Sequence, residues 1–365
     1  MRCASRHLLI LSLAALAFPL NAFGRTDEDK TGKDEPHLSI RTGLPCSQCH
    51  VNRTGGGART AFGSIYAQTR LPMRQSVFRG RFLNSFLSVG ADARIATEVT
   101  SGDSPDTGFG VEEANLYLEA RVVPDVLTVY IDQTVGPGSA TTREVFGLVD
   151  LSSDVYVKAG KFLLPYGLRL QDDAAFVRQQ TGFTFDTPDV GVEVGFEPGP
   201  LSVFASVTNG TQGAAENNDD KQVTASAALI FPSFRVGASG SHNDAPGSSR
   251  DVFGGFAGLG LGRVTILGEV DYIFDTFDTG ADSNQFAAYI EGDVLIARGI
   301  NLKATYGFLD PDRDIAENAR TRVRFGVELF PVPFLRIAAL YTMLEDIPQA
   351  TTDRDRLTIE LHGFF

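Results

Sequence analysis

Residues 322–330 read RVRFGVELF, and their pattern indicates the fold of most of the chain. Apolar residues stand at the odd positions from 323 to 329, while Arg322, Arg324 and Glu328 stand at even positions. Successive side chains of a β-strand point to opposite faces, so this period of two predicts a strand with one apolar and one charged face.

The same period recurs from about residue 80 onward, as in LYLEARV at 116–122 and NLKATYGFL at 301–309. Pro, Gly and Asp residues separate these stretches, which is typical of an all-β chain. We predict sixteen strands, near 83–97, 111–122, 125–133, 143–149, 154–163, 189–197, 200–208, 221–231, 233–242, 250–261, 263–273, 284–297, 299–309, 320–330, 333–344 and 354–365.

Periodicity alone leaves two architectures open, because a soluble sandwich buries the apolar face and a membrane barrel turns it toward lipid. Short turns such as Pro124-Asp125 alternate strictly with long polar loops, of which 164–188 is the longest, and this favours the barrel. The final RLTIELHGFF ends in Phe365 on an apolar face, which resembles the recognition signal of outer-membrane proteins. Residues 76–365 are therefore predicted to form a 16-stranded antiparallel transmembrane β-barrel of porin type.

The first 24 residues have the pattern of a secretory signal peptide. Arg2 and Arg6 precede the apolar run LLILSLAALAF, and small residues follow it before Arg25. The run is too short to span a bilayer, and no other apolar run approaches the roughly 20 residues of a membrane helix. We therefore expect an exported protein in the outer membrane of a Gram-negative cell, in contact with its lipid.

Charge excludes one class of partner and describes the barrel interior. The net charge of -13 argues against nucleic-acid binding. The face predicted to line the lumen carries both signs: Glu119, Arg121, Asp132, Lys158, Glu269, Asp271, Glu291, Asp293, Lys303, Arg322, Arg324, Glu328 and Arg336. Such a lining can hydrogen-bond a polar plug.

The stretch CSQCH at 46–50 carries the clearest chemical motif. Of three cysteines, Cys3 lies in the signal peptide, which leaves Cys46 and Cys49. A disulfide and a zinc site are alternatives, although zinc needs four ligands. The adjacent His50 favours a single covalent haem c, with Cys46 and Cys49 bound to the porphyrin edge and His50 as the proximal iron ligand.

The second axial ligand is open. Met73, near the end of the segment, is the first candidate and would raise the reduction potential, and His37 is the alternative. The position could also be vacant or filled by another group. The remaining His and Met residues after the signal peptide are Met343, His242 and His362.

Residues 25–75 form the predicted cytochrome segment. About 40 residues cannot build a large core alone, so we expect the segment to plug the barrel lumen. Residues 25–37 are charged and are interpreted as a flexible lead-in. The glycines at 55–57 are interpreted as slack that lets the chain turn back, and 60–73 as containing one short helix.

The barrel resembles the porin O and P family of anion-selective, including phosphate-selective, porins. The resemblance rests on KAGKFLLPYGL at 158–168 and VTNG at 207–210. It implies that the 164–188 loop folds inward and narrows the pore.

The stretch SIRTGLPCSQCH at 39–50, ahead of a sixteen-strand barrel, resembles the fused outer-membrane monohaem cytochrome–porins, which include iron-oxidising cytochromes. Arg41, Thr42, Gly43 and the CxxCH match, whereas Ser39-Ile40 replace the family's aromatic pair. The resemblance implies electron transfer across the outer membrane. An extracellular donor such as Fe(II) would be oxidised, and a periplasmic c-type cytochrome or other carrier would accept the electron.

A transport function is the alternative. In that interpretation the chain is an anion or solute porin, and the haem segment is a gate or redox sensor at the periplasmic mouth. A haem enzyme is a third reading, but it would need an open iron site with a distal acid–base group, and the sequence shows no clear one.

Overall fold

The computed structural model describes residues 36–78, 84–100, 107–216, 218–280, 282–347 and 354–365. The predicted signal peptide and residues 25–35 of the lead-in lie outside these ranges. The helices are α1 Pro36–Thr42, α2 Cys46–Cys49, α3 Ala61–Thr69 and α4 Phe176–Gln179. The strands are β1 Leu87–Thr100, β2 Thr107–Val123, β3 Leu127–Gly136, β4 Thr141–Asp150, β5 Val155–Phe162, β6 Asp189–Phe196, β7 Leu201–Thr208, β8 Gln222–Ile230, β9 Phe234–Ala245, β10 Ser248–Leu261, β11 Val264–Phe277, β12 Ser283–Ala297, β13 Ile300–Asp310, β14 Ala319–Leu329, β15 Leu335–Ile347 and β16 Arg354–Phe364.

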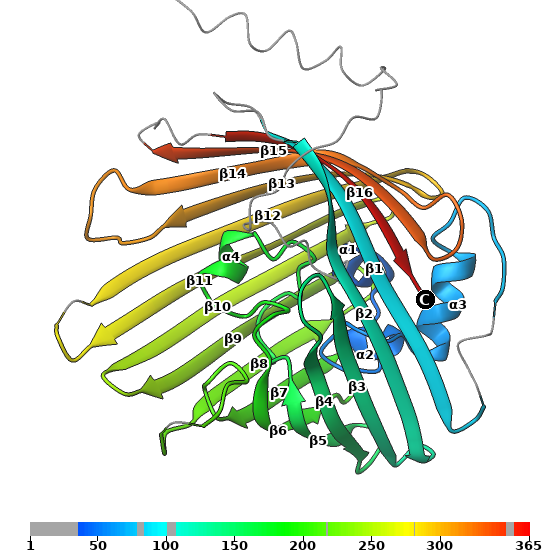
Figure 1. Ribbon diagram of the computed structural model, residues 1–365, viewed down its shortest axis with the longest axis horizontal. Coiled ribbons are helices and arrows are strands. Elements are labelled where there is room, and N and C mark those ends of the chain that lie inside the picture. The colour runs from blue at the N-terminus through cyan, green and yellow to red at the C-terminus, as the bar shows by residue number, and fades with distance from the viewer. Residues whose placement is uncertain (1–35, 79–83, 101–106, 217, 281, 348–353) are drawn as a thin grey trace, which may run out of the picture.

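The strands form one closed antiparallel barrel (Figure 1). Each strand pairs with its neighbours in sequence, and β1 closes the ring by pairing with both β2 and β16. The predicted sixteen-strand barrel is confirmed, and every predicted strand is present within a few residues of its expected bounds. Closure leaves no strand edge without a partner, which a barrel in lipid requires.

The predicted strict alternation of connection lengths is wrong at more than one place. On the long-loop side, β3 and β4 are joined by residues 137–140, no more than the four residues 151–154 that join β4 and β5 on the other side. β9 and β10 lie on the long-loop side, yet they are joined at Pro246-Gly247. Their hydrogen-bonded register continues to the pair Ala245 and Ser248, beyond the strand ends that the apolar period had suggested. Gly247 has φ +85°. Tight hairpin turns need such positive φ angles, which glycine and a few small polar residues adopt most readily.

The two faces of the wall differ in the way a membrane barrel requires. Large apolar side chains point outward, and Leu116 and Phe253 are more than half exposed at 53% and 54%. Charged side chains point inward and are shielded there, including Asp132 and Glu328 at 0% exposure. The apolar face is therefore the lipid-facing one, as predicted. Among the described residues, no helix has the length and apolar character needed to cross a bilayer.

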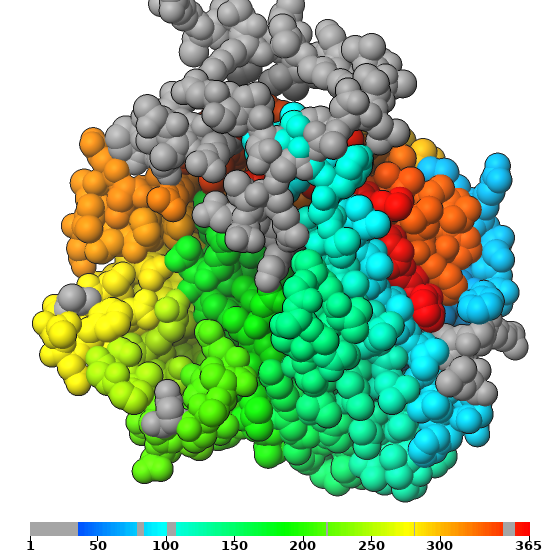
Figure 2. Space-filling model, viewed as in Figure 1, coloured from blue at the N-terminus to red at the C-terminus, as the bar shows by residue number. Residues whose placement is uncertain are grey.

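The long 164–188 loop folds into the lumen, as the porin resemblance implied. Leu164, Tyr166 and Phe176 are buried in one apolar cluster with inward-facing wall residues. α4 lies within the ring of strands in Figure 1. In the space-filling view, green side chains occupy the region between the teal and the yellow walls (Figure 2).

The N-terminal segment, residues 36–75, lies against short turns of the barrel, where Gly43 approaches Pro232 and Met73 bonds Phe330, and we call it the plug. α1 contacts β10 and β11, and Ile40 joins the apolar cluster of the inward loop. α3 lies at the rim beside the C-terminus (Figure 1). Thr60 caps α3 by accepting a 3.1 Å hydrogen bond from the Gly63 amide. The predicted short helix within 60–73 is thus confirmed.

Candidate functional site

One cavity lies between the plug, the inward loop and the barrel wall. Cys46, Cys49 and His50 line it from the plug, and residues 165–169 and Gln171 line it from the loop. The space between them, counted together with the part open to solvent, is about 1450 Å³. The CxxCH residues therefore face a partly open space that the plug, the loop and the wall share.

A single helical turn followed by a hairpin positions the motif. Cys46 and Cys49 begin and end α2, and the His50 amide donates a 2.9 Å hydrogen bond to the Cys46 carbonyl. His50 then pairs with Arg59 in an isolated antiparallel bridge. The Thr60 amide donates to the Cys49 carbonyl at 2.9 Å, which closes the hairpin onto α2.

The glycines at the tip of this hairpin are a rigid turn and not slack. Gly55, Gly56 and Gly57 are buried, and all three have positive φ values of +102°, +90° and +67°. A Cβ added to Gly57 would lie 2.1 Å from the Tyr130 hydroxyl oxygen. The same hydroxyl accepts a 2.9 Å hydrogen bond from the Ala58 amide. The chain does turn back here, as predicted, but through a fixed contact with β3.

Polar contacts fix the hairpin to the wall. The Asn52 side-chain amide donates to Glu144 at 2.8 Å, and its oxygen accepts from the Lys158 ammonium group at 3.2 Å. All three residues are buried. Arg53 forms ion pairs with Asp150 and, at 3.3 Å, with Glu197. These partners lie on β4, β5 and the turn after β6, so neighbouring strands on one side of the wall hold the hairpin.

Cys46 and Cys49 carry thiols, so the predicted disulfide alternative is not formed. Burial, with the neighbouring Cys46, raises the pKa of the Cys49 thiol to about 11, and Arg59 partly offsets this. A thiol with that pKa stays protonated at neutral pH and reacts slowly.

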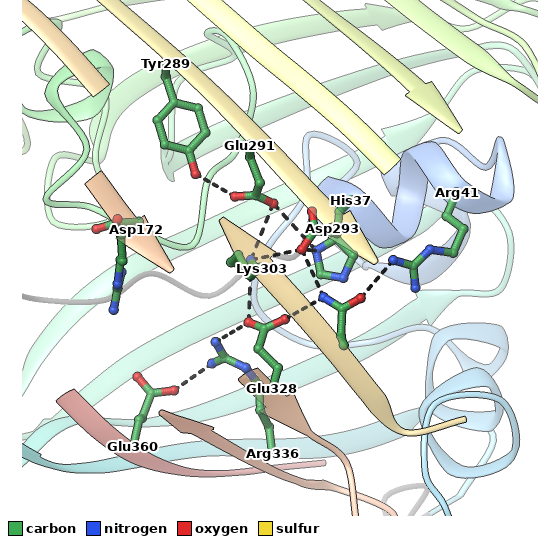
Figure 3. Close-up of polar contacts among 12 residues, drawn as sticks. His37, Arg41, Asp172, Tyr289, Glu291, Asp293, Lys303, Glu328, Arg336 and Glu360 are labelled. Atoms are coloured by element: carbon green, nitrogen blue, oxygen red, sulfur yellow. Dashed lines mark hydrogen bonds and ion pairs between the residues drawn. The ribbon is translucent and has the colours of Figure 1, made fainter. Parts of the chain in front are cut away.

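A zinc site is not assembled at the motif. In the described part of the chain, one group of three acidic or histidine side chains brings its ligand atoms within 4.8 Å, namely His37, Asp293 and Glu328. None of these is a motif residue. The Lys303 ammonium lies 3.5 Å from Glu328 and 4.0 Å from Asp293, so a protein cation already lies beside this group (Figure 3).

The structure does not bring either predicted distal ligand to His50. Met73 lies at the rim, 40% exposed, where its amide donates to the Phe330 carbonyl at 2.8 Å. It packs against Gly299 in a short turn and does not line the cavity. His37 is fully buried in α1, with Nδ1 3.8 Å from both Glu291 and Asp293 (Figure 3). It lines a different cavity.

A histidine that the sequence reasoning did not single out does line the cavity. His362 lies on the inward face of β16, with its ring 5.0 Å from that of Phe364. The guanidinium of Arg59, the bridge partner of His50, lies 4.3 Å from the centre of the Phe364 ring. The inward alternation of Glu360, His362 and Phe364 could have indicated this face, but not its proximity to the plug.

The residues around the cavity fit a covalently bound haem. Two thiols and a histidine from one short segment share the cavity with apolar side chains such as Phe204 and Phe256. Arg235 also lines it, nearly buried, and donates to the Ser39 hydroxyl and the Leu44 carbonyl. A planar apolar group with acidic edges suits this mixture of surfaces.

No protein-family model and no curated protein sequence matches the chain. Solved porin structures do resemble it. A loop-deletion mutant of OmpT, an outer-membrane protein of Vibrio cholerae, matches with TM-score 0.61 and 15% identity over 76% of this chain and 99% of that chain. An anion-selective porin of Comamonas acidovorans matches with TM-score 0.62 and 10% identity over 76% and 99%. The outer-membrane channel DcaP of Acinetobacter baumannii matches with TM-score 0.57 and 12% identity over 76% and 97%. This likeness shows a porin-type fold.

Proposed function

We propose that this chain carries one haem c in the cavity of its outer-membrane barrel and transfers single electrons across that membrane. Cys46 and Cys49 hold the group covalently, and His50 is the proximal iron ligand. Bound there, haem c supplies a one-electron redox centre. The observation that carries the proposal is that both thiols and His50 line one cavity inside the barrel.

The contents of the lumen support electron transfer, because the plug and the inward loop occupy part of it. The apolar band of a barrel wall is about 25 Å tall, so electrons need a centre held within it. The plug and the inward loop meet in one apolar cluster that includes Ile40 and Leu168. Leu168 of this cluster lines the cavity, and Arg235, which also lines it, would bind an acidic edge of the group.

The partners follow from the two ends of the barrel. The short turns would face the periplasm, where the plug at the rim is accessible to a soluble c-type cytochrome or another carrier. The long loops would face the exterior and an extracellular donor such as Fe(II). Acidic loop residues, including Asp278 and Asp312, would concentrate cations there.

A solute porin with a haem-containing gate is the second candidate, and the structural comparisons favour it. OmpT, DcaP and the anion-selective porin are named as outer-membrane proteins, channels or porins. The cavity also lies near the short turns, since Ser47 donates to Glu197 in the turn after β6 at 3.2 Å. A plug in that position is placed to open or close the periplasmic mouth.

Proteoliposomes separate the two functions. Wild-type protein would be inserted into vesicles that contain a c-type cytochrome, and Fe(II) would be added outside. We expect the enclosed cytochrome to be reduced with the wild type but not with His50→Ala. Equal reduction by both proteins contradicts electron transfer through this site. Large single-channel conductance of the wild type in planar bilayers would support the porin instead.

A further inference from the structure

His362 is held in one orientation at the seam of the barrel. Its Nε2 forms a 2.8 Å hydrogen bond with Asp92 Oδ2 on β1, and its side chain is only 3% exposed. The charged groups around it are Asp92, the register neighbour Arg94, and Glu360 and Arg336 on β16 and β15. The imidazole is therefore fixed by a carboxylate and cannot turn freely.

The other ring nitrogen of His362 is buried and has no hydrogen-bond partner among the residues that the structure describes. Leaving a buried polar atom unsatisfied costs about 1–3 kcal/mol, so such atoms usually have a function or a missing partner. A histidine that binds a metal commonly donates its second ring nitrogen to a carboxylate, which fixes the ring and raises its basicity. In His362, Nε2 bonds the Asp92 carboxylate in this way, and Nδ1 is the nitrogen that a metal would bind.

A chain of contacts places His362 close to the haem motif. His50 is the bridge partner of Arg59, Arg59 covers the ring of Phe364, and that ring lies 5.0 Å from His362. Within the described part of the chain, His50 and His362 are the only histidine or methionine residues that line the cavity. The two imidazoles thus approach the same space from the plug and from the wall.

We infer that His362 is the second axial ligand of the haem iron, bound through Nδ1 and oriented by Asp92. This inference rests on the proposed haem site. It replaces Met73 and His37 in that role, because both lie outside the cavity. Two histidine ligands predict a lower potential than the His/Met pair expected with Met73. Because His362 lies on β16, the iron site would be complete only after β16 has closed the barrel.

The test uses the full-length protein purified from a cell that attaches haem. The variants are His362→Gln, His362→Met and Asp92→Asn, with His242→Gln as the control. His242 is exposed and pairs with Asp244 and Asp251, away from the cavity. Haem staining after denaturation measures attachment, while absorption and EPR spectra report the axial ligands.

We expect every protein to retain covalent haem and the wild type to be low-spin without a sulfur–iron band. His362→Gln should become high-spin and bind added imidazole, which restores the low-spin spectrum. His362→Met should gain the sulfur–iron band and a higher potential, and Asp92→Asn should stay low-spin with a shifted potential. A low-spin spectrum and unchanged potential in His362→Gln would overturn the ligand assignment alone. Absence of haem from the wild type would overturn the proposed function as well.

Discussion

Asp92 and His362 are joined by a 2.8 Å hydrogen bond across the seam where the first and last strands close the barrel. The seam thereby contributes a side chain to the cavity that the plug also lines. Closure of the wall is consequently what brings His362 to the cavity.

Replacing Asp92 by alanine should destabilise the barrel. The change removes the partner of a buried imidazole and one carboxylate near the fully buried Arg94, so we expect a loss of about 1–3 kcal/mol in the free energy of unfolding. Denaturant unfolding followed by circular dichroism measures it. Asp244→Ala breaks the exposed pair with His242 and should cost less than about 1 kcal/mol. Equal losses in the two variants would show that the seam contact is not a buried structural bond.

Gly57→Ala should weaken the docking of the plug. Alanine at φ +67° costs about 1–2 kcal/mol, and its Cβ would also collide with the Tyr130 hydroxyl. The rate of trypsin cleavage within residues 50–60 reports plug release. Gly138→Ala is the matched control, because Gly138 has φ +85° but nothing within 4 Å of the added Cβ. No increase in cleavage for Gly57→Ala over that control would argue against the fixed turn.

Asn52→Leu should also release the plug, because it removes the side-chain amide that bonds buried Glu144 and Lys158. We expect a cost of about 1–3 kcal/mol for the lost contacts. Ion conductance in planar bilayers should rise as the plug leaves the lumen. In the control, Asn284→Leu removes an exposed 3.2 Å contact with Asp314 and should leave conductance unchanged. Unaltered conductance in Asn52→Leu would mean that other contacts suffice to hold the plug.

The inward loop should be sensitive to pH through Asp173. Burial, with the carboxylates of Asp186 and Glu113, raises its pKa to about 8 from 3.8, although the Phe185 amide partly opposes the shift. Between these two pH values the folded loop keeps a proton that the unfolded chain loses, so loop stability should fall as pH rises toward 8 and level off above it. Protease cleavage of residues 164–188 should increase over this range in the wild type. A similar increase in Asp173→Asn would exclude Asp173 as the cause.

The barrel could be predicted from the sequence because its determinants are local. The alternation of residues such as Leu302 and Lys303 indicates which face of the strand each occupies, and the turn residues indicate where the strands end. The β9–β10 turn at Pro246-Gly247 was not predicted, because the polar residues Asn243 and Asp244 continue the strand pairing without continuing the apolar pattern. Backbone hydrogen bonds, and not side-chain hydropathy, extend that hairpin.

The candidate site could be predicted only in part. The CxxCH motif is contiguous, so Cys46, Cys49 and His50 were evident from the sequence, and the cavity they share was not. His362 comes close to the plug only because β1 and β16 pair to close the barrel. Met73 is held at the rim by the hydrogen bond from its backbone amide to the Phe330 carbonyl. Distance along the chain therefore gave no guide to which further histidine lines the cavity, since long-range strand pairing decides it.

The central claim is that the plug carries a covalent haem inside the barrel, and intact-protein mass spectrometry tests it most directly. The protein would be purified from cells that attach haem to CxxCH motifs and treated with an alkylating reagent after denaturation. The account predicts a polypeptide heavier by one haem with no alkylated cysteine, and loss of that mass in the Cys46→Ser, Cys49→Ser double variant. A wild-type chain without haem that takes up alkyl groups on both cysteines would contradict it.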